Sequence, residues 1–324
     1  MKYLSLCAGG LKVSSLCLGT VSFGTAVRRE DAFAQMDLFY GKGGNFFDTA
    51  RVYADWLPGG HGASEKTLGA WIRERKIRDK VIIATKGAHP DLQAMHIPRM
   101  SAAEMRSDLE ESLRALETSY IDLYFLHRDD VSRPVEAILE NLEGFRKEGK
   151  IRHYGCSNWK LARMAEAEES AARLGFEGFV CDQIRFGLGD ITWEGAGDKT
   201  TVPMDSGIFA WHEKTGKAAM AYTSSCNGYF SKKLDNKPVP PEHEAVYGNA
   251  PNQKLLEKLK TWEKELGVPA AVLVSAYVAA QAFPAAPISS VSSLKQLNEL
   301  IQAADFDFPA DMLKEIRAVK KFVV

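Results

Sequence analysis

Hydrophobic and polar residues alternate along the chain with two different periods. Short apolar runs that are nearly continuous, such as VIIATK at 81–86, are typical of strands buried on both faces. Longer segments between them carry apolar residues at helical spacing, for example Met105, Leu109 and Leu113. Eight strand-like runs separated by helical segments predict an α/β fold, a single (β/α)8 TIM barrel domain over residues 1–324.

Turn and cap signals set the limits of the predicted elements. The predicted strands are 13–19, 45–48, 81–86, 121–127, 151–158, 179–186, 217–224 and 287–291. The predicted helices are 30–40, 64–75, 101–116, one beginning near Pro134, 161–174, 206–215, 252–266, 270–281, one beginning at Leu294, and a C-terminal helix at 309–321. Residues 1–12 predict an N-terminal β-hairpin that covers one end of the barrel, with Gly9 and Gly10 at its turn. The segment 225–250 predicts a long polar loop.

The composition narrows the class of protein. The chain has 324 residues, 45% of them hydrophobic, and a formal net charge of −1. It can therefore bury a sizeable core, and it offers no basic surface for nucleic acid or an anionic membrane. The five cysteines are scattered, and no apolar stretch is long enough for a secretory signal or a membrane span. We expect a cytoplasmic protein with free thiols.

Three consecutive predicted strands deliver a polar side chain at or near their ends. These residues are Asp48, Lys86 and His127, and Tyr53 follows Asp48 by five positions. Active sites of (β/α)8 barrels lie at the carboxyl ends of the strands, so the four side chains should share one pocket. One such residue alone would indicate a local ion pair, but the set predicts a functional site.

The residue types indicate proton transfer to a carbonyl oxygen. A lysine ammonium beside a tyrosine favours the phenolate, and Asp48 would hold Lys86 charged, so we expect a lowered pKa for Tyr53. His127, as a neutral imidazole, can hydrogen-bond the same oxygen. Because no side chain donates hydride, reduction of a carbonyl would require a nicotinamide.

The motifs that carry these residues resemble those of the aldo-keto reductase superfamily. They are GTVSFG, DTARVY, SEKTLG, ATK, LHRDD and IRHYGCSNW, and the resemblance covers essentially the whole chain. It implies an oxidoreductase that reduces an aldehyde or ketone to an alcohol, reversibly, with NAD(P)H bound across the strand ends. The catalytic tetrad of that family falls on Asp48, Tyr53, Lys86 and His127, with Tyr53 as the general acid.

The same resemblance implies a set of residues that contact the cofactor. Besides Asp48 they are Gly19, Thr20, Ser157, Asn158, Gln183, Tyr222, Thr223, Ser225, Asn227, Gly228, Ser290, Ser292, Ser293, Gln296 and Glu299. Members that prefer NADP(H) often carry two basic residues in the last of these segments, whereas here Lys295 alone is positive. A 2′-phosphate favours charge-assisted contacts, so the family favours NADP and the sequence leaves NAD open.

The substrate is the least determined feature. Tyr53, His127, Trp56 and Trp193 are candidates for the substrate-binding wall, although either tryptophan could instead anchor its loop. The segment ADWLPGG resembles that of family members associated with sugars or similar polyols, and this resemblance implies a sugar-like carbonyl. The LHRDD motif does not predict a metal site. Two alternatives remain open: a non-catalytic, nicotinamide-sensing partner subunit of the same fold, and a hydrolase or lyase that uses Asp48 and His127.

Overall fold

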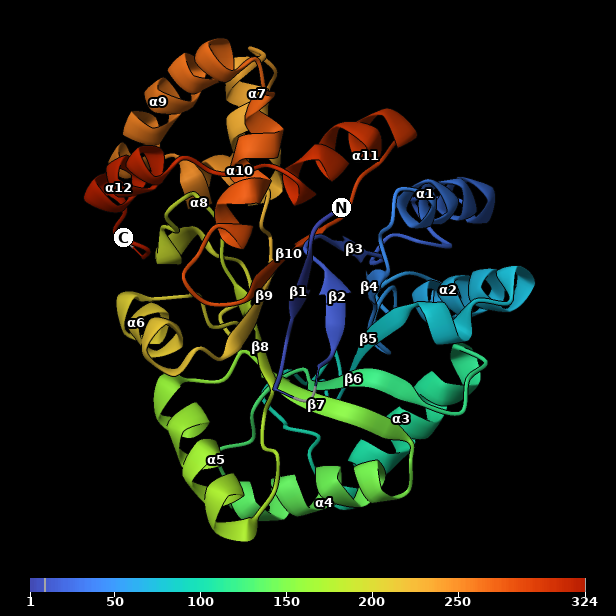
Figure 1. The fold of residues 1–324 in the computed structure, drawn as a ribbon. Coiled ribbons are helices and arrows are strands. Elements are labelled where there is room, and N and C mark those ends of the chain that lie inside the picture. The colour runs from blue at the N-terminus through green and yellow to red at the C-terminus, as the bar shows by residue number, and fades with distance from the viewer. Residues whose placement is uncertain (9, 324) are drawn as a thin grey trace.

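The computed structural model describes residues 1–8 and 10–323 and contains a closed barrel of parallel strands (Figure 1). The barrel strands are β3 (Cys17–Gly19), β4 (Phe46–Asp48), β5 (Ile82–Gly87), β6 (Ile121–Leu126), β7 (Ile151–Ser157), β8 (Cys181–Arg185), β9 (Ala218–Tyr222) and β10 (Ala285–Ser289). They follow one another in chain order, and β10 closes the ring by pairing with β3. The predicted eight-stranded TIM barrel is confirmed.

Helices surround the strands on the outside of the ring (Figure 1). They are α1 (Arg29–Gly41), α2 (Ala63–Arg75), α3 (Ala102–Ala115), α4 (Val135–Lys147), α5 (Leu161–Leu174), α6 (Ser206–Thr215), α7 (Tyr229–Leu234), α8 (Pro241–Tyr247), α9 (Ala250–Leu266), α10 (Ala270–Ala279), α11 (Leu294–Leu300) and α12 (Ala310–Val319). The sequence signal for α3 corresponds to a complete capping box, in which Ser101 and Glu104 each bond the backbone N–H of the other. No helix in the described part of the chain is long and apolar enough to cross a membrane.

The N-terminal hairpin consists of β1 (Tyr3–Ser5) and β2 (Lys12–Ser14). The predicted strand 13–19 was wrong at its start, because Ser14 belongs to the hairpin and β3 begins at Cys17. The chain turns between them, where the Ser14 hydroxyl donates to the carbonyl of Leu16 at 2.7 Å. Gly10, predicted at the turn, has a positive φ of 84°, and Gly9 lies outside the described residues.

The hairpin closes the amino-terminal end of the barrel. Its apolar residues Leu6, Leu11 and Val13 are buried against the barrel interior, where they join Phe46 and Leu123 in one hydrophobic cluster. In Figure 1 the hairpin lies across the ring of strands. The opposite end, where the strands finish, is therefore the end available to a substrate.

The segment 225–250 differs from its prediction as a loop. It contains the short helices α7 and α8, and it buries Tyr229, Phe230 and Tyr247. Helices of six and seven residues are too short to show a helical period clearly in sequence. This segment is ordered by tertiary packing: α7 lies against α9 and α10, and α8 lies against α7 and the 3-10 helix Trp193–Gly195.

Candidate active site

Asp48, Lys86 and Tyr53 meet at the carboxyl end of the barrel. Lys86 Nζ donates to both carboxylate oxygens of Asp48, at 2.9 and 2.8 Å, and lies 2.9 Å from the Tyr53 hydroxyl. Gln183 Nε2 donates to Asp48 Oδ1 at 2.8 Å. Asp48 and Lys86 are each 1% exposed, so this ion pair is fully desolvated and its two charges depend on each other. The structure thus brings together three of the four residues predicted to form the tetrad.

The pKa of Tyr53 contradicts the expectation of a lowered value. Burial raises the pKa to about 12; the positive charge of Lys86 lowers it, and the negative charge of Asp48 raises it again. The loss of hydration that a buried phenolate suffers outweighs its attraction to one ammonium at hydrogen-bond distance. That attraction is weakened because Asp48 neutralises the ammonium. Tyr53 therefore holds its proton at neutral pH.

His127 follows β6 and faces the same pocket. Its ring centroid lies 6.2 Å from that of Tyr53. Its Nδ1 is buried and has no hydrogen-bond partner in the described part of the chain. Burial, followed by the charge of Arg128, holds the pKa of His127 well below its ordinary value. The imidazole is neutral, as the sequence analysis expected.

His89 is a second histidine in this pocket that the sequence analysis missed. Its ring centroid lies 4.7 Å from that of His127, and its Nδ1 faces the carbonyl of Pro90 at 2.7 Å. Burial lowers its pKa to about 4. The available signal was its position three residues after Lys86, on the loop that leaves the same strand.

Arg128 ties the irregular segment after β8 to this end of the barrel. Its guanidinium pairs with Asp198 at 2.8 Å and donates to the Thr200 hydroxyl at 2.9 Å. Both partners lie between β8 and α6, in a segment that contains only a short 3-10 helix, Trp193–Gly195. This arginine of the LHRDD motif thus holds a loop beside the pocket.

The residues expected beside the nicotinamide form a linked group on β7, β8 and β9. Ser157 Oγ donates to the carbonyl of Gln183 at 2.7 Å. Asn158 has a positive φ of 62°, and its Oδ1 accepts from the Tyr222 hydroxyl at 2.6 Å. Its Nδ2 donates to the carbonyl of His127 at 3.2 Å, which joins this group to the tetrad. The structure brings these predicted residues together.

Gly19 and Thr20 lie beside Asp48 at the end of β3. A Cβ atom at Gly19 would stand 2.6 Å from the Ser290 hydroxyl, so any larger residue would force the Ser290 side chain to move. The Ser290 hydroxyl donates to the carbonyl of Gly19 at 3.0 Å. The Thr20 hydroxyl is turned away from the pocket and bonds the backbone of Asp48 and the hydroxyl of Ser64. We therefore expect Thr20 to contact a cofactor through its backbone.

The turn after β9 has an unusual backbone. Thr223, Cys226, Asn227 and Gly228 have φ angles of 53°, 51°, 53° and 71°. Left-handed conformations at non-glycine residues are costly and cluster at functional sites. Successive residues of this kind turn backbone N–H groups toward one side, as in anion-binding turns. The predicted contacts Ser225 and Asn227 are both half-buried here.

Arg185 is a buried cation beside this turn that the sequence analysis also missed. It is 9% exposed, and its Nε has no hydrogen-bond partner among residues 1–8 and 10–323. Because side chains alternate along a strand, it points to the same side of β8 as Gln183, into the barrel mouth. It pairs in register with Tyr222. A buried cation in this position fits a phosphate group.

The last predicted cofactor segment is exposed. The Ser292 hydroxyl donates to Gln296 Oε1 at 2.9 Å, and Ser293 caps the backbone N–H of Gln296 at 3.3 Å. Ser292, Ser293, Lys295 and Gln296 are all exposed, and Glu299 is half-buried. These groups are free to meet an anion, although none of them is preorganised by burial.

The two tryptophans have different environments. Trp56 is 52% exposed at the rim of the barrel, where Leu57, Ile97 and Val131 are exposed as well. Trp193 is half-buried, and Lys199 lies over its ring at 5.0 Å, which fits an anchor of its loop. A polar cleft of about 360 Å³ adjoins the loop that carries Tyr53, but no tetrad residue lines it.

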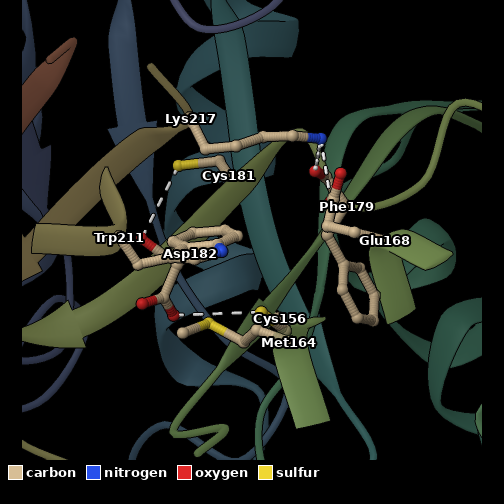
Figure 2. A pocket seen from close by; sticks show the side chains of 8 residues that line it. All are labelled: Cys156, Met164, Glu168, Phe179, Cys181, Asp182, Trp211 and Lys217. Carbon is tan, nitrogen blue, oxygen red and sulfur yellow. Dashed lines mark hydrogen bonds and ion pairs between the residues drawn. The ribbon is translucent and has the colours of Figure 1, made fainter. Parts of the chain in front are cut away.

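A second cavity lies behind the strands and is too small for a substrate. Its volume is about 10 Å³, enough for one water molecule at most. Figure 2 shows Cys156, Cys181 and Asp182 among the residues that surround it. Burial raises the pKa of both thiols well above the ordinary value, so neither is a reactive cysteine.

Comparison with known proteins gives consistent matches along the chain. The model of the aldo/keto reductase family matches residues 15–321. An uncharacterized oxidoreductase, YrpG, of Bacillus subtilis is 30% identical over 98% of this chain and 96% of its own length. An aryl-alcohol dehydrogenase [NADP(+)] of Phanerodontia chrysosporium is 31% identical over 53% of this chain and 47% of its own length.

The fold is also found among solved structures. An aldo-keto reductase from Klebsiella pneumoniae in complex with NADPH superposes with a TM-score of 0.73. The alignment covers 100% of this chain and 96% of that one, at 21% sequence identity. At this identity the likeness supports the barrel fold alone.

Proposed function

Because the chain belongs to the aldo/keto reductase family of NAD(P)-dependent oxidoreductases, we propose that it reduces an aldehyde or ketone to an alcohol, reversibly, with NADPH. The observation that supports this most directly is the contact of Lys86 with both Asp48 and Tyr53. A buried phenol held against a charged lysine is suited to giving up a proton to an oxygen that becomes negative.

In this proposal Tyr53 is the proton donor. A bound nicotinamide supplies the hydride to the carbonyl carbon. The Tyr53 hydroxyl gives its proton to the carbonyl oxygen as negative charge develops there. Lys86, 2.9 Å away, then stabilises the phenolate, and Asp48 keeps Lys86 charged and fixed in place. Because its pKa is about 12, Tyr53 stays protonated at neutral pH until an alkoxide forms.

His127 would position the carbonyl. Its ring stands close enough to that of Tyr53 for one oxygen atom to lie between them. Since burial keeps the imidazole neutral, it can donate a hydrogen bond without competing as an acid. His89 packs edge-on against His127 and restricts its rotation.

The residues present fit a nicotinamide dinucleotide. The group of Ser157, Asn158, Gln183 and Tyr222 would hold the nicotinamide end, beside the backbone at Gly19. The left-handed turn at 223–228 and Arg185 would receive the two bridging phosphates. Ser292, Ser293 and Lys295 are the candidates for the 2′-phosphate, and the relative named for NADP(+) supports NADP over NAD.

For the substrate we propose an aromatic aldehyde or ketone in preference to a sugar-like one. The rim beside the pocket exposes Trp56 and Leu57, which suit an aromatic ring. One relative is named an aryl-alcohol dehydrogenase. A panel of aryl and sugar carbonyls, run with NADPH and NADH side by side, tests both choices. Tight NADPH binding without any turnover would instead support the nicotinamide-sensing alternative.

The proposed acid is tested by Tyr53→Phe. The variant should bind NADPH with unchanged affinity, measured by quenching of protein fluorescence, because the hydroxyl contributes to proton transfer. It should lose turnover by about 10²-fold or more, the usual contribution of a general acid. Turnover near the wild-type rate would refute the role of Tyr53. Unchanged NADPH binding shows that any loss is chemical and not a loss of fold.

A further inference from the structure

A cysteine, a histidine and a glutamate converge at the closed end of the barrel, far from the tetrad. Cys7 belongs to the N-terminal hairpin, His153 lies near the start of β7, and Glu177 precedes β8. Cys7 Sγ lies 3.9 Å from His153 Nδ1, and the two oxygens of Glu177 lie 3.2 and 3.1 Å from the same nitrogen. One ligand atom from each residue falls within 4.8 Å of the others.

Hydrogen bonding explains only part of this arrangement. A single imidazole nitrogen either carries one proton or accepts one. If His153 Nδ1 donates to Glu177, it has no lone pair left for the Cys7 thiol. A catalytic Cys–His–Glu set would place the thiol and the carboxylate on opposite ring nitrogens. Here the thiol and the carboxylate both approach the same ring nitrogen, which is the arrangement expected of ligands around a bound cation.

The spacing of the three groups fits a tetrahedral ion. Bonds of about 2.3 Å to sulfur and about 2.0–2.2 Å to nitrogen and oxygen place neighbouring ligand atoms about 3.3–3.6 Å apart. The separations of 3.9 and 3.1 Å from His153 Nδ1 lie a few tenths of an ångström from that range. The Cys7 sulfur and a Glu177 oxygen lie within 4.8 Å of each other. Rotation of these two side chains would bring all three ligands to bonding distance, with water as the fourth ligand.

The surroundings prepare these side chains for such a role. The carbonyl of Cys7 accepts from Gly10 N–H at 3.1 Å and from the Ser5 hydroxyl at 2.9 Å, which fixes the backbone of the thiol. His153 and Glu177 are 18% and 27% exposed, which gives an ion access from solvent.

We propose that Cys7, His153 and Glu177 bind a divalent transition-metal ion of the zinc class. Thiolate, imidazole and carboxylate together suit zinc, whereas magnesium and calcium prefer oxygen ligands alone. On binding, the thiol proton leaves to solvent and the neutral imidazole carries its proton on Nε2. The ion joins the hairpin to the barrel wall and stabilises the closed end. This site is independent of the proposed carbonyl reduction.

Titration of the full-length, reduced and chelator-treated protein with cobalt(II) tests the proposal. We expect one cobalt per chain and a thiolate-to-cobalt charge-transfer band, which zinc removes by competition. Zinc should also raise the midpoint of thermal unfolding, because it binds the folded chain. Cys7→Ser should abolish the band, and His153→Gln should weaken cobalt binding by about tenfold or more. His96→Gln, which alters an exposed histidine elsewhere, should bind as the wild type does.

Two results would overturn the site: the same charge-transfer band in Cys7→Ser, or cobalt binding that does not saturate. Glu177→Gln provides a second variant at a more exposed position, in case the cysteine substitution disturbs the hairpin. Circular dichroism establishes that each variant is folded before titration. Equal zinc stabilisation of Glu177→Gln and the wild type would also count against the proposal.

Discussion

At the scale of single residues, the site depends on how burial and charge balance. Asp48 and Lys86 form a buried ion pair, and this pairing leaves little net positive charge to lower the pKa of Tyr53. The result is an acid that retains its proton, next to a histidine that burial keeps neutral. Residue identities alone suggested the opposite sign for Tyr53, because they do not report desolvation.

Arg185 provides a residue-scale test of the cofactor site. Arg185→Met should raise the dissociation constant for NADPH by about tenfold or more, because a charge-assisted contact to phosphate is lost. Fluorescence quenching measures the constant. Arg28→Met removes a charge that is largely exposed on the surface and should leave the constant unchanged. An unaltered constant in Arg185→Met would remove this residue from the phosphate site.

His89 makes stability depend on pH. Its folded pKa of about 4 lies below that of an exposed histidine, so the unfolded chain binds the extra proton between about pH 6.5 and 4. The contribution of neutral His89 to the free energy of unfolding is fully present above pH 6.5. It is lost as pH falls, by about 2 kcal/mol between pH 7 and 5. Urea unfolding at both pH values should show a smaller loss for His89→Asn.

The matched control for that measurement is His96→Asn, at an exposed position. It should show the same difference between pH 7 and pH 5 as the wild type. If His89→Asn loses as much stability between pH 7 and pH 5 as the wild type does, the buried neutral state of His89 is not the cause of that loss. Other groups that titrate in this range, the carboxylates included, are common to all three proteins and cancel in the comparison.

At the scale of elements, a barrel strand places a polar side chain at its carboxyl end, and the segment that follows holds the strand end in position. The first turn of α2 shows this, because the Ser64 hydroxyl bonds both Thr20 and Thr49 at 2.7 Å, on either side of Asp48. Glu65, one residue later, accepts from the Thr85 hydroxyl at 2.6 Å. The start of α2 thus holds three consecutive barrel strands in place behind the tetrad.

Glu65 gives the element-scale prediction. Burial raises its pKa to about 7, so the folded chain keeps a proton that the unfolded chain loses above about pH 4.5. This contribution to stability is complete below pH 4.5 and is lost as pH rises through 7. Glu65→Gln keeps an acceptor for Thr85 and removes the cost of ionisation. It should therefore be more stable than the wild type at pH 8, with a gain about 2 kcal/mol larger than at pH 5.

Urea denaturation at the two pH values checks this expectation. Glu74→Gln, at an exposed position on the same helix, serves as the control and should show no such pH-dependent gain. A gain for Glu65→Gln that is equal at pH 5 and pH 8 would mean that packing, and not ionisation of the carboxyl, is responsible.

At the scale of the whole molecule, the two ends of the barrel have separate tasks. The hairpin fills the amino-terminal end with apolar side chains, while the opposite end carries the polar site. Stability and chemistry can therefore change independently. This division also places the proposed zinc ligands far from the proposed carbonyl chemistry.

Leu6→Ala tests this separation. Leu6 is 2% exposed, and truncation of a buried leucine costs about 2–5 kcal/mol. The midpoint of urea unfolding should fall accordingly, whereas kcat and KM of the folded protein should stay at wild-type values. Leu294→Ala, at a position 45% exposed, should change stability little. A changed KM in Leu6→Ala would show that the two ends are coupled.

The order of apolar runs was enough to predict the barrel, because strands buried on both faces and helices buried on one side leave different periods in sequence. The strand-end positions of Asp48, Lys86 and His127 were enough to predict a shared pocket. Tertiary structure decided the rest. The pKa of Tyr53, the roles of His89 and Arg185, and the cluster of Cys7, His153 and Glu177 depend on burial and on contacts between distant segments. Those quantities arise only when the chain folds, and no local pattern encodes them.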